Sequence, residues 1–212
     1  MKDDVITIKS EHQFETVINK SRFICYIKPV QTEDDAKAFI QSIKKKHHEA
    51  THNCSCYTIG DTMNIQKAND DGEPSGTAGV PMLEVLKKND IHNTVAVVTR
   101  YFGGIKLGGG GLIRAYSGAV RNAVNDIGLV VLKNAIPMTV TVSYDLTGKL
   151  EHEIQSTTFM LKDTTYTDKV SYDIDVIETE RDDFIDFLNR HTQSNYELHE
   201  GDVTRLPFDL EK

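Results

Sequence analysis

The sequence predicts an α+β protein of two domains, and three observations support this. Short β-branched apolar runs alternate with amphipathic helical patterns along the 212 residues. The elements expected after residue 135 follow the order β-α-β-β-α-β, which is the ferredoxin-like pattern. Charge also changes there, because residues 1–134 hold 17 Lys and Arg against 15 Asp and Glu, whereas residues 135–212 hold 7 against 17. We therefore expect a domain boundary near Asn134-Ala135.

The first domain begins with two strands and a helix. Residues 12–19 and 21–30 alternate in the manner of strands, and 32–48 has the helical period. Thr32 is the expected N-cap of this helix, with acidic residues in its first turn and lysines in its last. A hairpin around Gly60-Asp61 follows.

Next comes a turn-rich stretch, DDGEPSGTAG (70–79), leading into a short helix for which Thr77 is the expected cap. Residues 93–102 are apolar with almost no polar alternation, which is typical of a buried strand. A glycine-rich loop and a long helix ending at Gly128 follow, and LVVL (129–132) is the last expected strand of the domain.

The second domain contains the remaining elements. The expected strands and helices are a strand at 137–145, a helix at 146–156, a hairpin of 158–167 with 169–178, a helix at 181–192 and a strand at 195–203.

Composition limits the location of the protein. No apolar stretch reaches the length of about 18 residues that a membrane span requires. The acidic N-terminus, MKDDVITIKSEHQF, lacks the apolar core of a secretory signal. Three cysteines do not form a disulfide framework, so we expect a cytoplasmic protein without membrane partners.

The stretch RYFGGIKLGGGG (100–111) is the first candidate site, since six of its twelve residues are glycine. Glycines between a strand and a helix leave backbone N–H groups free to bind an anion, and nearby cations supply countercharge. The aromatic residues Tyr101, Phe102 and Tyr116 could stack nucleobases or belong to the core. No Gly-Lys-Ser/Thr follows, so a P-loop is not indicated. Alternatively, the glycines only permit positive φ and close packing. The candidate contacts are Arg100, Tyr101, Gly103, Gly104, Lys106, Gly108, Gly110, Gly111 and Arg114.

The stretch 70–79 is the second candidate site. Carboxylates of Asp70, Asp71 and Glu73 could hold a hard cation such as Mg²⁺. The N–H groups of Gly76, Thr77 and Gly79 suit an anion instead. The alternative is a solvated acidic turn followed by a helix cap. If the two glycine-rich helix starts meet in space, they form one groove lined by backbone.

A zinc site is the third candidate. His52, Cys54 and Cys56 point to the same side of a strand, and Cys25 on a neighbouring strand could complete a tetrahedral set. Cysteine is also common in protein cores, so burial is the alternative.

The motifs DDGEPSGTAGVPML and VVTRYFGGIKLGGGGLIRAYSGAV resemble the Impact family, in particular its bacterial YigZ-type members. The resemblance implies a first domain like domain 2 of ribosomal protein S5, with helices on one face of a sheet. It implies a ferredoxin-like second domain similar to the last domain of translocation factor G. Two positions depart from the pattern: Val80 stands where bacterial relatives often carry lysine, and Gly109 where threonine is frequent.

Three functional hypotheses follow. Eukaryotic Impact proteins regulate translation by binding the activator of a starvation kinase, so the resemblance implies a link to translation. We expect a non-enzymatic protein that binds RNA or the ribosome through the glycine-rich groove, without a cofactor. The alternatives are a regulator that binds protein only, and a metal-dependent hydrolase using Asp70, Asp71 and Glu73.

Overall fold

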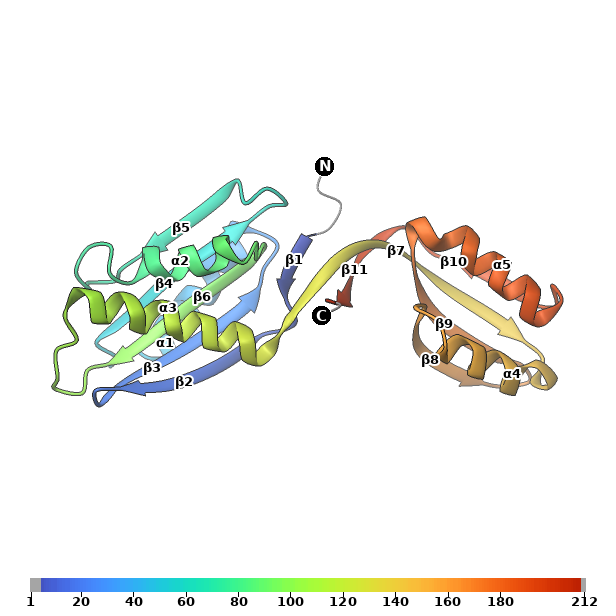
Figure 1. The fold of residues 1–212 in the computed structure, drawn as a ribbon, viewed down its shortest axis with the longest axis horizontal. Helices are drawn as coiled ribbons and strands as arrows, with labels where there is room; N and C mark the ends of the chain where they lie inside the picture. The colour runs from blue at the N-terminus through green and yellow to red at the C-terminus, as the bar shows by residue number, and fades with distance from the viewer. Residues whose placement is uncertain (1–4, 211–212) are drawn as a thin grey trace. The chain divides into compact units, whose positions relative to one another are not determined.

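The computed structural model of the protein describes residues 5–210, and the chain divides into two compact units (Figure 1). The first unit comprises the chain up to Val131 together with the C-terminal segment from Phe208, whereas the second unit is Leu132–Pro207. The outer limits expected for the two domains, residues 1 and 212, lie outside the described residues. No described helix has the length and hydropathy needed to cross a membrane.

The first unit is built on a five-stranded sheet of order β2-β3-β6-β4-β5, in which neighbouring strands are antiparallel. The central strand, β6, is the apolar run predicted from the sequence, and it is buried because it lies between β3 and β4. The strands are β2 (His12–Ile18), β3 (Ser21–Pro29), β4 (His52–Ile59), β5 (Ile65–Asn69) and β6 (Thr94–Tyr101).

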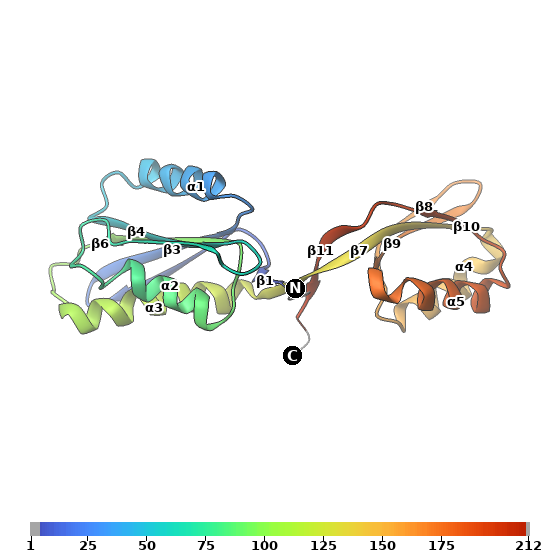
Figure 2. The same ribbon diagram turned by 90° about the horizontal axis from the view of Figure 1, so that it is seen from above.

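Helices cover both faces of this sheet, which corrects the expectation of helices on one face. On one face, α1 (Glu33–Lys46) packs Phe39 and Ile43 against alternate strand residues. On the other face lie α2 (Gly79–Lys88) and α3 (Gly108–Ile127), as Figure 2 shows. Because successive strand side chains point to opposite faces, the inner strands β3, β4 and β6 each contribute to two separate hydrophobic clusters.

The second unit carries its helices on one face only. Its elements follow the predicted order β-α-β-β-α-β, and β7 lies between β9 and β10 with β8 outside β9. Both helices contribute to a single hydrophobic cluster with alternate strand residues. The elements are β7 (Leu129–Val142, in this unit from Leu132 on), α4 (Tyr144–Gln155), β8 (Met160–Tyr166), β9 (Val170–Ile177), a 3-10 turn (Glu178–Glu180), α5 (Arg181–Thr192) and β10 (Glu197–Glu200).

Strand β7 differs from the prediction of two separate strands with a domain boundary between them. It continues from Leu129 through Pro137 to Val142, and Pro137 pairs with Asp175 of β9. Two strands also escaped prediction, namely β1 (Val5–Ile8) and β11 (Thr204–Asp209). Both pair with β7, so their partners lie far away in sequence and no local hairpin signal marks them.

Candidate functional site

The two glycine-rich stretches meet in the first unit at one cavity of about 440 Å³, here called the glycine cavity. Its apolar lining comes from Pro74, Phe102, Leu107 and Leu112. Its polar and backbone lining comes from Thr51, His52, Glu73, Arg100, Lys106, Gly108 and Gly109. The groove considered from the sequence therefore exists as a cavity between the loop before α2 and the loop before α3.

A buried ion pair lies beside the cavity. Arg100 Nη1 donates to Glu73 Oε1 at 2.6 Å, and the Tyr116 hydroxyl donates to the same oxygen at 2.7 Å. Arg100 is only 5% exposed, and its guanidinium lies 5.4 Å from the ring centroids of Phe23 and Phe102. Arg100, predicted to supply countercharge to an anion, is thus buried and its charge is balanced by Glu73.

His52 faces the second oxygen of Glu73. His52 Nδ1 lies 2.8 Å from the carbonyl oxygen of Asp71, and His52 Nε2 lies 3.7 Å from Glu73 Oε2. A carbonyl oxygen only accepts hydrogen bonds, so Nδ1 carries the proton and Nε2 is an acceptor when the imidazole is neutral. The polar lining of the cavity thus combines two acceptor atoms with a charge-balanced ion pair.

The start of α2 is filled by a side chain of the protein. Asp70 accepts hydrogen bonds from the backbone N–H groups of Gly76, Ala78 and Gly79 at 2.8, 3.1 and 2.8 Å. Partial burial raises the pKa of Asp70, but these three donors outweigh it and leave the pKa below its ordinary value. The N–H groups of Gly76 and Gly79 are therefore not available to an external anion.

Thr77, predicted as the N-cap of α2, has a different role. The N-cap is Ala78, and the Thr77 hydroxyl donates to the carbonyl oxygen of Pro74 at 2.6 Å. Asp70 supplies the cap from a position well before the helix. The usual capping-box spacing joins residues three apart, so it does not reveal this arrangement.

The three acidic residues considered as metal ligands bind separate sets of protein donors. Asp71 accepts from Lys44 Nζ at 2.6 Å and from the backbone N–H of Asn53 at 2.7 Å. Asp70 binds the start of α2, and Glu73 binds Arg100. Within residues 5–210, no group of three His, Cys, Asp or Glu side chains is placed to hold a metal ion.

The start of α3 has no comparable acceptor. Among the described residues, no side chain accepts a hydrogen bond from its first N–H groups, and its first turn holds no acidic residue. Lys106, just before the helix, is exposed and lines the glycine cavity. Arg114 is exposed, and its Nη1 would lie 3.6 Å from a Cβ at Gly110, so the guanidinium lies close to the first turn.

Packing requires some of the loop glycines but not all. A Cβ on Gly103 would lie 2.0 Å from the backbone of Lys20, and Gly108 has a φ of +69°. A Cβ on Gly109, by contrast, would meet no atom closer than 4.0 Å, and its φ is not positive. Glycine in a helix costs about 1 kcal/mol relative to alanine, so Gly109 weakens the helix without a packing reason.

Other predicted contacts of the loop have structural roles or open surroundings. The Tyr101 hydroxyl bonds His47 Nδ1 at 2.8 Å, and Tyr116 is fully buried. A Cβ on Gly111 would approach Leu107 Cβ at 3.0 Å, whereas Gly104 has open space around it. Phe102 alone among the three aromatic candidates is largely exposed, at 46%, and it lines the cavity.

The cysteines considered for zinc belong to the core. Cys25, Cys54 and Cys56 are buried, and Cys54 Sγ donates to the carbonyl oxygen of Asp70 at 3.0 Å. Burial raises the pKa of the Cys25 and Cys54 thiols to about 12. These thiols are therefore protonated at neutral pH and are poor nucleophiles.

Both units match known sequence families. Residues 19–124 match the Impact N-terminal domain, and residues 140–195 match a domain of unknown function (DUF1949). IMPACT family member YvyE of Bacillus subtilis is 50% identical over 206 residues, which cover 97% of this chain and 95% of YvyE. The chain belongs to the Impact family.

More distant Impact relatives share mainly part of the chain. YigZ of Escherichia coli is 43% identical over 112 residues, 52% of this chain and 55% of YigZ. Protein IMPACT of Oryctolagus cuniculus is 30% identical over 103 residues, 46% of this chain and 32% of that protein. The crystal structure of a hypothetical protein aligns with a TM-score of 0.61 at 28% identity, covering 93% of this chain and 97% of the other.

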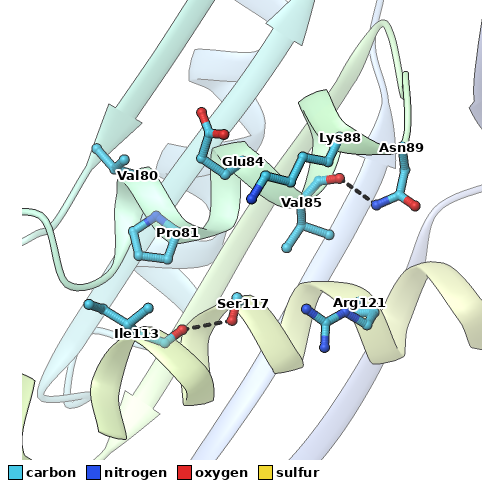
Figure 3. A pocket seen from close by; sticks show the side chains of 9 residues that line it. All are labelled: Val80, Pro81, Glu84, Val85, Lys88, Asn89, Ile113, Ser117 and Arg121. Atoms are coloured by element: carbon cyan, nitrogen blue, oxygen red, sulfur yellow. Dashed lines mark hydrogen bonds between the residues drawn. The ribbon is translucent and has the colours of Figure 1, made fainter. Parts of the chain in front are cut away.

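A second hollow, the α2–α3 groove, lies between the two helices and measures about 360 Å³. Figure 3 shows Val80 and Pro81 of α2 opposite Ile113 and Ser117 of α3, with Arg121 further along α3. Val80 is 50% exposed and Ile113 is 42% exposed. Sequence reasoning did not identify this groove, because an exposed isoleucine within the apolar pattern of α3 has no distinct local signal.

Proposed function

We propose that this Impact-family protein binds RNA through its first unit, as a non-enzymatic, ribosome-associated protein that acts in translation. The observation that carries the proposal is the open start of α3. Its N–H groups are not used by a protein acceptor among the described residues, and the cations Lys106 and Arg114 lie nearby. The positive end of a helix beside exposed cations suits a phosphate group.

The unexplained glycine supports the same function. Gly109 keeps the backbone bare beside the glycine cavity although packing would accept a side chain. A bare backbone lets a phosphate approach the N–H groups directly. The exposed ring of Phe102 at the same cavity offers a stacking surface for a base.

Co-sedimentation with ribosomes at low and moderate salt tests the proposal. We expect pelleting of the wild type to fall as salt rises, because phosphate contacts release counterions. A Lys106→Glu/Arg114→Glu variant should pellet less at both salt concentrations. Arg100→Glu is unsuitable, because it would place a second carboxylate beside the buried Glu73.

The matched control is Lys37→Glu/Lys45→Glu on α1, which makes the same charge change on the opposite face of the sheet. This control should pellet like the wild type. Equal losses in both variants would mean that only net charge matters, and would contradict a phosphate site at α3. No pelleting at any salt would contradict ribosome association.

A protein partner is the second candidate, and the α2–α3 groove is the observation that favours it. Exposed Val80 and Ile113 beside a groove are typical of protein contacts. Binding of this kind should change little with salt and should be weakened by Ile113→Asp. Pull-down of partners with the wild type and this variant, at two salt concentrations, separates the two functions.

A further inference from the structure

We infer that the glycine cavity holds a single unpaired guanine base, with the phosphate of the same nucleotide at the start of α3. This inference rests on the proposed RNA-binding function and names the part of RNA that the site recognises. Its volume, about 440 Å³, lies within the range of about 300–1,000 Å³ that is usual for small-molecule sites.

Charge decides which end of a nucleotide lies inside. The Glu73 carboxylate is 3% exposed and lies beside the cavity, so it would repel a phosphate placed against it. The Arg100 guanidinium is already bound to Glu73. The uncompensated cation of the cavity is the exposed Lys106, next to the open start of α3. The phosphate therefore belongs at Lys106 and the base belongs against Glu73.

The walls suit a flat ring. Pro74, Leu107 and Leu112 are apolar, and Phe102 presents an aromatic ring that is 46% exposed. Unpaired RNA bases are commonly stacked on aromatic side chains and recognised by hydrogen bonds on their Watson–Crick edges. A base seated here would stack on Phe102 with its edge toward His52 and Glu73.

The polar atoms select the base. Glu73 Oε1 already accepts from Arg100 and Tyr116, whereas no donor among residues 5–210 lies within hydrogen-bond distance of Oε2. When the imidazole is neutral, Oε2 of Glu73 and Nε2 of His52 are two acceptors 3.7 Å apart. Guanine is the base whose Watson–Crick edge carries two adjacent donors, the ring N1–H and the 2-amino group. Adenine, cytosine and uracil would each place an acceptor against this pair, which costs free energy when buried.

The test measures binding of short uridine oligomers that carry one central guanosine, inosine, adenosine or uridine. Inosine keeps the ring N1–H but lacks the 2-amino group. We expect the guanosine oligomer to bind wild-type protein about tenfold more tightly than the inosine oligomer, the usual scale for losing a hydrogen bond to a buried polar group. Guanosine and inosine monophosphates are titrated in parallel to distinguish free nucleotide from RNA.

A variant adds a readout of specificity. His52→Ala removes one acceptor and should reduce the guanosine preference toward unity. His48→Ala, on an exposed histidine that does not line the cavity, is the matched control and should keep the preference. The ligand series on unmodified protein gives a result even if His52→Ala is unstable.

The outcomes separate the two proposals. Equal, salt-sensitive binding of all four oligomers would overturn the guanine inference and leave RNA binding in place. Preference for guanosine monophosphate without binding of any oligomer would support the cavity assignment and contradict the RNA proposal. No binding of oligomers or mononucleotides would overturn both.

Discussion

The starts of α2 and α3 are similar in sequence but differ in whether a protein side chain binds their N–H groups. Each follows a glycine-rich loop, and each offers backbone N–H groups at a helix N-terminus. At α2, the Asp70 carboxylate accepts from the N–H groups of Ala78 and Gly79 and from that of Gly76 in the preceding loop. At α3, no side chain of the described residues does so, and the nearby charges are Lys106 and Arg114. The N–H groups at the start of α2 therefore stabilise the fold, whereas those at the start of α3 are not bound by any side chain of residues 5–210.

The buried ion pair joins the loop before α2 to strand β6, and breaking it should have the largest effect on stability. Arg100→Ala leaves the Glu73 carboxylate buried without its cation, so we expect the free energy of unfolding to fall by about 3–5 kcal/mol. Urea denaturation measures this loss. Arg22→Ala, which removes an exposed pair with Glu15, is the control and should change stability far less. Similar losses of unfolding free energy in the two variants would contradict the prediction that burial makes the Arg100–Glu73 pair more important for stability.

Removing the internal anion from α2 should have the next largest effect. Asp70→Ala leaves three N–H groups without their acceptor, and we expect a loss of about 2 kcal/mol near pH 7. Because the pKa of Asp70 is lowered in the folded state, its stabilisation is complete above the ordinary value of 3.8 and is lost as pH falls through the folded-state value. The stability gap between wild type and variant should therefore narrow in acid.

Urea denaturation of both proteins at neutral and acidic pH checks this prediction. Asp70→Asn keeps an acceptor oxygen and should lose less stability than Asp70→Ala. The affinity for RNA should be unchanged by either substitution if the two helix starts have separate roles. A gap that widens in acid would contradict the assignment of Asp70 as the internal anion.

Filling the bare backbone of α3 should have the smallest effect on stability and the opposite sign. We expect Gly109→Ala to raise the free energy of unfolding by up to about 1 kcal/mol and to weaken RNA binding, because the new methyl group lies beside the N–H groups. Gly118 lies in the same helix and also has open space around it, so Gly118→Ala should raise the free energy of unfolding similarly without changing the affinity for RNA. Urea denaturation and RNA titration of both variants measure this. Equal RNA affinity of the two variants would contradict a ligand at α3.

The two units show how far local pattern predicts a fold. The helix at 33–46 with its Thr32 cap, the hairpin of β4 with β5 and the end of α3 at Gly128 were all predicted, because their signals lie within a few residues. Strands β1 and β11 were not predicted, because they are short and their partner β7 is distant in sequence. The coverage of the first sheet on both faces was also missed.

By itself, the sequence determined the succession of elements apart from β1 and β11, the two candidate loops and the acidic character of residues 135–212, since periodicity, glycine content and charge are local properties. The tertiary structure decided which groups remain available. Arg100 is buried because β6 is the central strand, and its charge is balanced by Glu73, which lies 27 residues away in sequence. The Asp70 carboxylate binds the N–H groups at the start of α2, whereas no side chain of the described residues binds those at the start of α3. These contacts join residues that are distant in sequence, so the local sequence pattern does not predict them.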